Sequence, residues 1–575
     1  MKSINCNSVA LFVSVFLIHS IFYAQMYVGP NTFVYATNQL VFINQDLDLN
    51  TNSSTFYLRN DAQLLQGTTG IGTNKGLGNL SLFQEATANN FQYNYWCSPV
   101  GNTLTSTSVN NSFGIRQLGI PNTNTETIPA TILASNIFDG TASPLKIASY
   151  WIYKFINKTT NSQWVQAGST MTIAPGEGFT MKGSSGTNST IVNGVQNNPD
   201  GFSQRYDFRG KPNDGTINIP VLADELTLTG NPYPSAINLQ DFLISETNCT
   251  GIAYFWQHDK TVTTHFTPDY KGGYATYSGA NIYVPAPFFQ YDGSGYPITT
   301  VKSDATILEK KYAAMGQGFF VKGLAKGNVQ MKNKYRTFVK EDLINISKNE
   351  TSSIIRINSL IDNGPIIQNV LAFNPLATEN IDRNMDASSI NDTPSNVYFV
   401  LNNKEFVINS MPFDSDRKIP LGFKCLYQTN IKITVNEIAN LPEVTIIYLF
   451  DKTTGKYHDI KNSFVELNLP AGTTNNRYEI TFKNNTLGLD EIENKDFIII
   501  QNNIEKTVTI QNPFQKEISS INIYDVAGKL IVNKSKLGNE LSYTFPTSNL
   551  SSGVYIVKMD TVDTTEQGQK IIIQN

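Results

Sequence analysis

Two histidines and two aspartates lie close together in the sequence, at His258, Asp259, His265 and Asp269. Imidazole nitrogens and carboxylate oxygens are common ligands of transition metals, so this segment could bind one if it folded back on itself. The spacing matches no established ligand set. The alternative is a polar hairpin loop, which needs no metal.

A second group of oxygen-bearing side chains occupies alternate positions at Asp382, Asn384 and Asp386. Alternating Asp and Asn in a loop gather hard oxygen ligands, so calcium is the one cofactor that the sequence suggests. Ala387 and Thr393 stand where a calcium loop of the EF-hand kind has Gly and a bidentate Glu. The alternative is that these carboxylates cap turns.

Aromatic side chains offer a third kind of chemistry, the stacking of rings on sugar faces. They make up 11% of the chain and are dense in two stretches before residue 300. We predict a glycan-facing group at Trp256, Tyr270, Tyr274 and Tyr277, where a Gly-Gly loop adjoins the rings. The alternative is that these rings belong to the core, because buried aromatic residues dominate β cores.

Catalytic motifs are missing from the sequence. It contains no H-E-x-x-H, G-x-S-x-G or C-x-x-C, so zinc proteolysis, esterase-type acyl transfer and thiol redox chemistry lack support. A glycoside hydrolase needs two carboxylates that converge across a cleft, and nothing in the sequence selects such a pair. The sequence therefore favours a protein that is not an enzyme.

One motif, G-x-G-F-x-x-K-G, occurs twice, at residues 176–183 and 316–323. A phosphate-binding loop needs its glycines to open a helix, but both copies continue as β-type residues. We interpret each copy as a tight turn that leads into a core strand, with Phe pointing inward and Lys at the exposed end. Similar stretches around Pro99 and Pro232 precede the two copies, which predicts two related β modules.

Short runs of alternating apolar and polar residues continue along the chain and predict an all-β protein with several antiparallel β-sandwich modules in series. Near the N-terminus these runs fit either a meander or a pair of solenoid-like coils. The predicted segments are a signal peptide at 1–24, an N-terminal strand cap with a Gly/Thr loop at 25–89, the two related modules at 90–200 and 201–345, a β-sandwich at 346–485, a linker and strand lead-in at 486–510, and a small C-terminal β-sandwich at 511–575.

Composition and charge restrict the class of protein. Charged residues make up 16% of the 575 residues and the net charge is -4, with no basic stripe, so no nucleic-acid partner is expected. Residues 1–24 have the basic start, apolar run and small final residue of a secretory signal. No later apolar run reaches the ~20 residues of a spanning helix, so membrane association is expected only by tethering. The remaining cysteines, Cys97, Cys249 and Cys425, do not indicate a disulfide framework.

The C-terminal segment carries a recognisable set of residues, namely Asn512, Pro513, Asp525, Gly528, Gly553 and Tyr555. With them it resembles the type A C-terminal sorting domain of the type IX secretion system, found in secreted and surface proteins of flavobacteria and other Bacteroidetes. The resemblance implies a small β-sandwich that the secretion machinery recognises. It also implies passage through the periplasm to a secreted or outer-surface location.

These features together predict an exported cell-surface or extracellular protein that is not an enzyme and acts in adhesion or in glycan or matrix binding. The paired aromatic modules and the lack of a catalytic motif favour this function. Two alternatives stay open, because sorting domains of this kind accompany hydrolases as well as adhesins. One is a secreted hydrolase acting on polysaccharide, and the other is a structural surface spacer.

Overall fold

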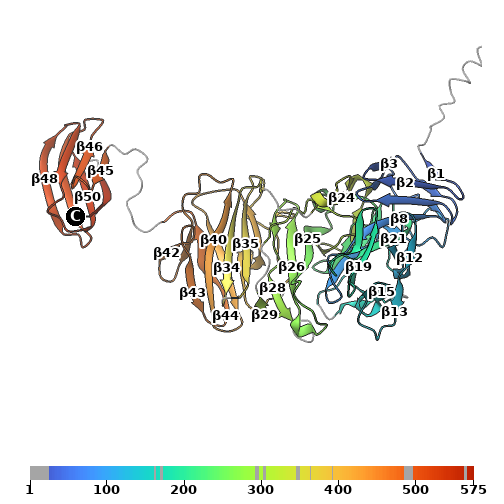
Figure 1. The fold of residues 1–575 in the computed structure, drawn as a ribbon. Helices are drawn as coiled ribbons and strands as arrows, with labels where there is room; N and C mark the ends of the chain where they lie inside the picture. Colours follow the sequence, from blue (N-terminus) through green and yellow to red (C-terminus); the bar gives the residue numbers. More distant parts are fainter. Residues whose placement is uncertain are drawn as a thin grey trace, which may run out of the picture. The chain divides into compact units, whose positions relative to one another are not determined.

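The computed structural model describes residues 25–160, 163–168, 172–291, 297–301, 306–344, 350–362, 364–391, 393–484, 497–562 and 566–574. The chain forms two compact units, which divide between Lys483 and Asn484. Strands dominate both units (Figure 1), so the predicted all-β class is confirmed. The predicted signal peptide at 1–24 lies outside the described residues.

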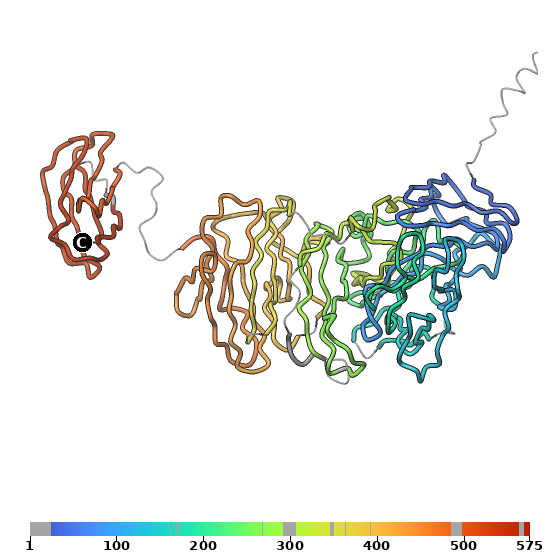
Figure 2. Tube along the Cα trace, in the orientation of Figure 1, coloured from blue at the N-terminus to red at the C-terminus, as the bar shows by residue number. Residues whose placement is uncertain are grey.

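The N-terminal segment winds into solenoid coils, because its strands pair in parallel rather than as a meander. Figure 2 shows these coils as stacked blue turns of the chain. The strands stack in three rows: β1 (Met26–Val28), β4 (Leu47–Leu49) and β7 (Lys75–Gly76); β2 (Phe33–Thr37), β5 (Thr55–Arg59) and β8 (Asn79–Glu85); β3 (Leu40–Ile43) and β6 (Gln63–Gln66). Leu47, Phe56 and Leu80 point inward and are buried, so each coil stabilises the next.

The coils share a sheet with the segment that follows them. β8 pairs antiparallel with β21 (Arg205–Pro212), which pairs in turn with β11 (Leu118–Pro121), and β11 pairs with β12 (Thr127–Pro129). One hydrophobic cluster extends from Val28 in the first coil to Phe208 on β21. The coils are therefore packed as part of the first unit and not as a separate cap.

The two copies of the glycine motif form strands with matching partners. β18 (Gly178–Lys182) pairs with β9 (Tyr93–Cys97), and β31 (Gly318–Gly323) pairs with β23 (Leu226–Gly230), both antiparallel. In each pair the first glycine of the motif strand faces the last residue of its partner, and Phe179 and Phe319 are fully buried. Duplication of one module stays a prediction. If it occurred, the two strand pairs should have the same register, as they do.

The two strand pairs also pack against each other, and the motif strand of each pair contacts the partner strand of the other. A Cβ atom at Gly178 would lie 2.6 Å from Leu228 Cγ on β23, and one at Gly318 would lie 2.8 Å from Trp96 N on β9. Glycine is needed at both positions because any side chain would overlap the facing strand. Gly178 and Gly318 therefore serve close strand packing.

The second motif strand belongs to a seven-stranded sheet. After β23 and β31 its strands are β25 (Cys249–His258), β26 (Lys271–Ser278), β27 (Tyr283–Val284), β28 (Phe288–Tyr291) and β29 (Pro297–Val301). A short helix, α2 (Leu239–Ser245), begins at Asn238, whose side chain accepts a hydrogen bond from Asp241 N. Leu239, Phe242 and Leu243 bury the inner face of this helix against the sheet.

Residues 354–481 form a β-sandwich of two layers. One layer is β38 (Ile408–Met411), β35 (Ile366–Phe373), β34 (Ile354–Ile361), β40 (Thr429–Ala439) and β43 (Val465–Leu469); the other is β37 (Lys404–Phe406), β36 (Asn396–Leu401), β39 (Lys418–Cys425), β44 (Gly472–Thr481), β41 (Tyr448–Asp451) and β42 (Lys456–Asp459). Side chains such as Ile357, Phe399 and Leu421 fill the space between the layers. A separate cluster joins Tyr254 and Phe320 to Ile354 and Val370, so this sandwich shares a core with the sheet before it.

The second unit is a smaller sandwich. Its sheets are β45 (Ile498–Asn502), β46 (Thr507–Gln511) and β49 (Ser542–Pro546), and β48 (Leu530–Gly538), β47 (Ile518–Asp525), β50 (Gly553–Thr561) and β51 (Glu566–Ile573). β46 is the central strand of its sheet, and Phe497 and Ile499 belong to the core. The sandwich therefore begins before residue 511, the boundary predicted from the sequence.

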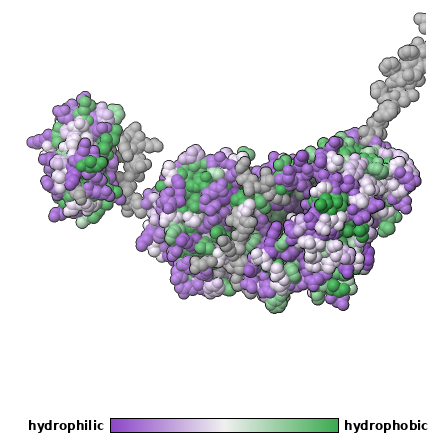
Figure 3. Space-filling view, in the orientation of Figure 1, coloured by the Kyte–Doolittle hydropathy of each residue, from purple (hydrophilic) through white to green (hydrophobic). Residues whose placement is uncertain are grey.

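On the face of the molecule drawn in Figure 3, apolar residues lie in small groups among polar ones. Among the described residues, no helix is long and apolar enough to span a membrane.

Candidate functional site

Lys182, the lysine of the first glycine motif, is 3% exposed and lies among aromatic rings. Its Nζ atom is 3.5 Å from the ring centroid of Trp151, 4.8 Å from that of Tyr270 and 5.0 Å from that of Tyr93. It also donates a hydrogen bond to the Tyr270 hydroxyl. The prediction that this lysine lies at the exposed end of its strand is wrong, because the segment before β26 packs over it.

The second motif has a different environment at the same place. The side chain of Lys322 is 26% exposed, and its Nζ atom lies 3.2 Å from Asp224 Oδ1 on the surface. The motif alone therefore does not bury its lysine. Burial depends on the aromatic side chains that other parts of the fold supply.

His265 connects the buried lysine to an exposed carboxylate. Its Nδ1 atom lies 2.9 Å from Lys182 Nζ, and its Nε2 atom lies 3.0 Å from Asp139 Oδ1. The imidazole ring stacks on Trp151 at 4.9 Å with an interplanar angle of 23°. An Nε2–H that donates to Asp139 leaves Nδ1 to accept from Lys182, so the three groups form a hydrogen-bonded chain.

Burial sets the charge states in this group of side chains. It lowers the pKa of Lys182 to about 6, and the nearby Asp139 carboxylate offsets only part of that effect. Burial and the nearby lysine also lower the pKa of His265. Partial burial of Asp139 acts in the opposite direction, but hydrogen bonds from His265 and Asn90 hold its pKa below the usual value. At neutral pH the carboxylate is therefore charged while the lysine and the histidine are largely neutral.

Two exposed phenylalanines flank the Asp139–His265 pair. Phe138 is 43% exposed and Phe266 is 64% exposed, and they are the chain neighbours of Asp139 and His265. The Phe138 ring packs at 4.7 Å against Tyr150 and at 5.8 Å against Trp151. We refer to these side chains collectively as the Lys182 cluster: Tyr93, Phe138, Asp139, Trp151, Lys182, His265, Phe266 and Tyr270.

The predicted glycan-facing aromatics are not gathered into one group. Tyr270 lies in the Lys182 cluster. Trp256 and Tyr274 contact each other at 5.1 Å, and both contact Tyr95, whose hydroxyl lies 2.8 Å from that of Tyr274. Tyr277 is fully buried, so its inclusion in the predicted group is wrong. It faces the core because side chains alternate along β26.

The four residues first considered as metal ligands have separate environments. Only His265 enters the Lys182 cluster, while Asp259 accepts hydrogen bonds from the backbone and hydroxyl of Thr261. No group of three His, Cys, Asp or Glu side chains suited to a metal occurs in the part of the chain that the structure describes. Asp259 makes the contacts of a polar loop, whereas His258 is the last residue of β25.

The segment predicted to bind calcium makes a different set of contacts. Asp386 accepts from Asp382 N at 2.6 Å and from Ser410 N at 2.6 Å, and Asp382 accepts from Thr378 Oγ1 at 3.0 Å. Asn384 has a positive φ of 58°, and its N atom donates to Thr250 O. The carboxylates cap turns here, as the alternative interpretation proposed, and calcium binding stays a prediction.

Arg383, within the same segment, docks the 354–481 sandwich onto α2. Its guanidinium donates to the carbonyl oxygens of Leu243 at 2.6 Å, Ile244 at 2.9 Å and Cys249 at 2.9 Å, and to Glu246 O. The last carbonyls of a helix have no partner within it, and they carry partial negative charge. Arg383 satisfies them from another part of the fold.

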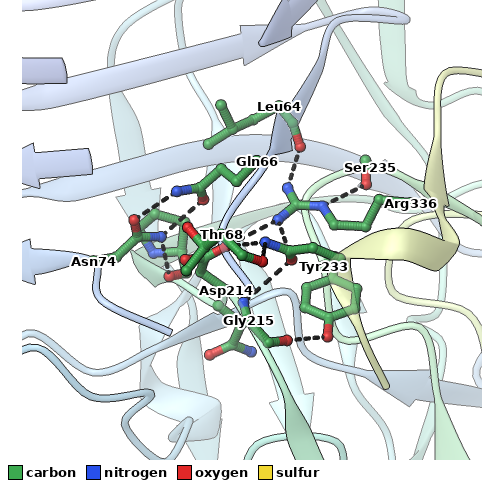
Figure 4. Close-up of polar contacts among 12 residues, drawn as sticks. Leu64, Gln66, Thr68, Asn74, Asp214, Gly215, Tyr233, Ser235 and Arg336 are labelled. Atoms are coloured by element: carbon green, nitrogen blue, oxygen red, sulfur yellow. Dashed lines mark hydrogen bonds and ion pairs between the residues drawn. The ribbon is translucent and has the colours of Figure 1, made fainter. Parts of the chain in front are cut away.

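A buried arginine, Arg336, joins the N-terminal coils to the sheets after them (Figure 4). Arg336 donates to Leu64 O and pairs with Asp214 at 3.5 Å, with side chains 1% and 0% exposed. Gln66 and Asn74 exchange hydrogen bonds of 2.8 and 2.9 Å beside this pair. Burial lowers the pKa of Arg336 to about 10. These contacts hold the N-terminal coils against the following sheets, so we interpret the network as structural.

The predicted sorting-domain residues build turns and strand ends in the second unit. Asn512 is fully buried and donates to Lys516 O at 2.8 Å, with Pro513 exposed beside it. Asp525 accepts from Lys529 N at 2.9 Å across a turn in which Gly528 has a φ of 79°. Gly553 opens β50, on which Tyr555 is buried and donates to Ser551 O at 2.9 Å.

Comparison with known families assigns both units. Residues 131–482 match the family model described as "Domain of unknown function (DUF8693)", which covers more than half of the chain. The chain belongs to this family. Residues 501–574 match the model described as "Secretion system C-terminal sorting domain". The type IX sorting domain directs export to the outer surface or the extracellular space, and the secretion machinery recognises it.

Other comparisons add little to the DUF8693 match. No curated protein matches the chain. One solved structure, a DUF3244 family protein from Bacteroides vulgatus with an immunoglobulin-like β-sandwich fold, covers 14% of this chain and 85% of its own, at 12% identity and a TM-score of 0.13.

The residue range that matches DUF8693 contains every member of the Lys182 cluster except Tyr93. Sequence reasoning considered His265 only as a metal ligand, placed Lys182 on the surface and did not consider Asp139. The three residues are separated by long stretches of chain, so no local pattern connects them. A lysine that ends a core strand near an aromatic run is the one signal that could have pointed to the cluster.

Proposed function

We propose that this chain is an exported surface protein of a Bacteroidetes bacterium that acts in adhesion, without catalysis, by binding carbohydrate at the Lys182 cluster. One observation carries the proposal: an exposed carboxylate, Asp139, hydrogen-bonds to His265 beside the half-buried Trp151 ring, and each of the two has an exposed phenylalanine, Phe138 or Phe266, as its chain neighbour. Exposed rings bind the apolar faces of sugars, and carboxylate oxygens accept hydrogen bonds from their hydroxyls.

The arrangement supports a neutral carbohydrate over an acidic one. The Asp139 side chain is 63% exposed, and its pKa is held low by the hydrogen bonds from His265 and Asn90, so it stays negative at neutral pH. A carboxylate or sulfate on the ligand would be repelled by this charge. The buried Lys182 amine, largely neutral, offers little compensation.

A glycan array probed with the mature chain, residues 25–575, tests the proposal, followed by calorimetric titration of the sugars it retains. We expect Phe138→Ala to weaken binding by about fivefold, since an aromatic contact contributes ~1 kcal/mol. Asp139→Asn keeps the size of the side chain but removes its charge and should also weaken binding. His265→Gln should have a smaller effect, because it acts through Asp139.

Phe464→Ala provides the matched control, since Phe464 is 49% exposed and lies in the 354–481 sandwich. This variant should bind as tightly as the unmodified chain. Equal binding by the Phe138, Asp139 and Phe464 variants would remove the Lys182 cluster from the function. Release of new reducing ends from a polysaccharide would instead favour the hydrolase alternative.

A further inference from the structure

The first solenoid coil ends in strands that have a free edge. β1, β2 and β3 are terminal strands of their sheets, and among the described residues they pair only with β4, β5 and β6. The longest of them, β2, ends a seven-stranded sheet. Its outer edge carries backbone N–H and C=O groups that can pair with another strand.

The side chains of this coil are apolar where they face solvent. The exposed fractions are 62% for Tyr27, 63% for Phe33, 37% for Tyr35, 46% for Leu40 and 60% for Phe42. Figure 3 shows apolar residues among polar ones over the part of the surface where Figure 1 labels β1, β2 and β3. Solenoids normally end in a capping repeat with a polar outer face, and the described residues before β4 supply no such repeat.

The coil is also uncharged. Residues 26–45 contain no Lys, Arg, His, Asp or Glu, and the next charged side chain along the chain is Asp46, at the start of the next coil. In natural proteins, charged residues, prolines or bulges on an edge strand prevent it from pairing with another chain. β2 (Phe33–Thr37) contains no charged residue and no proline. Two copies of the coil would therefore approach each other without charge repulsion.

We propose that the free edge of β2 is an interaction surface for a second copy of this chain, with the two β2 strands pairing antiparallel about a twofold axis. A neutral, apolar edge is complementary to itself, so it fits an isologous contact. It offers no charge to attract a nucleic acid or an anionic lipid surface. The inference goes beyond carbohydrate binding, and it would place two Lys182 clusters on one particle, which raises the avidity of attachment.

Sedimentation of the mature chain over a range of concentrations tests the pairing. We expect a monomer–dimer equilibrium for the unmodified chain. Phe33→Lys and Phe42→Lys should each give a monomer at every concentration, because each adds a positive charge to an uncharged coil, and two such coils would repel each other at the contact. Both positions are exposed, so the variants should keep the melting temperature of the parent.

Phe464→Lys is the matched control, because Phe464 is 49% exposed and lies in the 354–481 sandwich. It should leave the dimer intact. A cross-link locates the contact: Tyr35→Cys should form a covalent dimer on oxidation, since Cys97, Cys249 and Cys425 are buried and do not compete.

Two results would overturn the inference. One is a chain that stays monomeric at all concentrations, including a monomer that instead binds an added strand-forming peptide. The other is a dimer that persists in both lysine variants and gives no cross-link through residue 35.

Discussion

Lys182 and Lys322 hold the same position in two copies of one motif, and their surroundings differ. Lys182 is enclosed by Trp151, Tyr93 and Tyr270, whereas Lys322 reaches the surface and pairs with Asp224. A lysine buried beside a mainly aromatic floor loses solvation that its hydrogen bonds do not restore. Such a residue lowers stability at neutral pH.

The first prediction concerns the pH dependence of stability. Burial lowers the pKa of Lys182 from 10.5 to about 6, so between these values the unfolded chain binds a proton that the folded chain does not. The contribution of Lys182 to the free energy of unfolding therefore becomes more favourable as the pH rises from about 6 toward 10.5. Lys182→Met should melt at a higher temperature than the parent near pH 7 and should lose this rise.

Thermal unfolding of the parent and the variant at several pH values within that window measures the effect. Lys322→Met is the control, because its half-exposed ion pair contributes only ~0–1 kcal/mol. If Lys182→Met melted below the parent at every pH, the amine would be charged and stabilising in the folded state, and the interpretation would fail.

At the scale of elements, loops from one sheet complete sites on another. The segment around Arg383 belongs to the 354–481 sandwich in sequence. Its guanidinium nevertheless donates hydrogen bonds to the last carbonyl oxygens of α2, which packs on the preceding sheet. The loop before β26 does the same for Lys182 through His265 and Tyr270. These contacts explain why residues 25–483 do not separate into modules joined by free linkers.

The second prediction follows from the bonds of Arg383. Arg383→Ala would leave the carbonyl oxygens at the end of α2 without a donor, and we expect a loss of about 3 kcal/mol in the free energy of unfolding. Thermal and urea unfolding of the mature chain measure this loss. Arg417→Ala is the control, because Arg417 pairs at 3.1 Å with Glu379, whose side chain is 78% exposed, and should change stability by less than ~1 kcal/mol. Equal losses in the two variants would contradict the docking role.

At the scale of the whole molecule, the sorting domain and the candidate binding site belong to different units. The sorting domain has its own core, which includes Phe497, Ile510, Ile523 and Val557. Hydrophobic clusters of the first unit contain no residue of the second among those described. Each unit therefore has the core that independent folding requires.

The third prediction uses the corrected start of the sorting domain. Removing residues 484–575 should leave the first unit folded with an unchanged melting temperature, and the protein should accumulate in the periplasm instead of reaching the surface. Cell fractionation and thermal unfolding measure the two effects. Surface display of the truncated chain would contradict the export role.

Transfer to a reporter distinguishes the two boundaries. Residues 484–575 fused to a periplasmic reporter should direct it to the cell surface. A fusion that starts at residue 511 lacks β45 and nearly all of β46, the central strand of its sheet, and should fail. Equal export of both fusions would show that the first two strands are dispensable for recognition.

The all-β class, the presence of a sorting domain and the strands that carry the glycine motif were predictable from the sequence. Alternating apolar residues such as Ile521 and Ile523, and turn residues such as Gly528, encode local structure that needs little help from distant parts. The start of the sorting domain was not predictable, because β46 enters it by pairing with β49, more than thirty residues along the chain, and β45 enters it by pairing with β46.

Only the tertiary structure decided which polar residues act together. Asp139, Lys182 and His265 come from three distant segments, and Arg383 acts on a helix more than a hundred residues before it. Alternation along a strand predicts which side a residue faces but not what packs on that side. The burial of Lys182, and with it the candidate binding site, is therefore a product of contacts between segments that no local pattern in the sequence records.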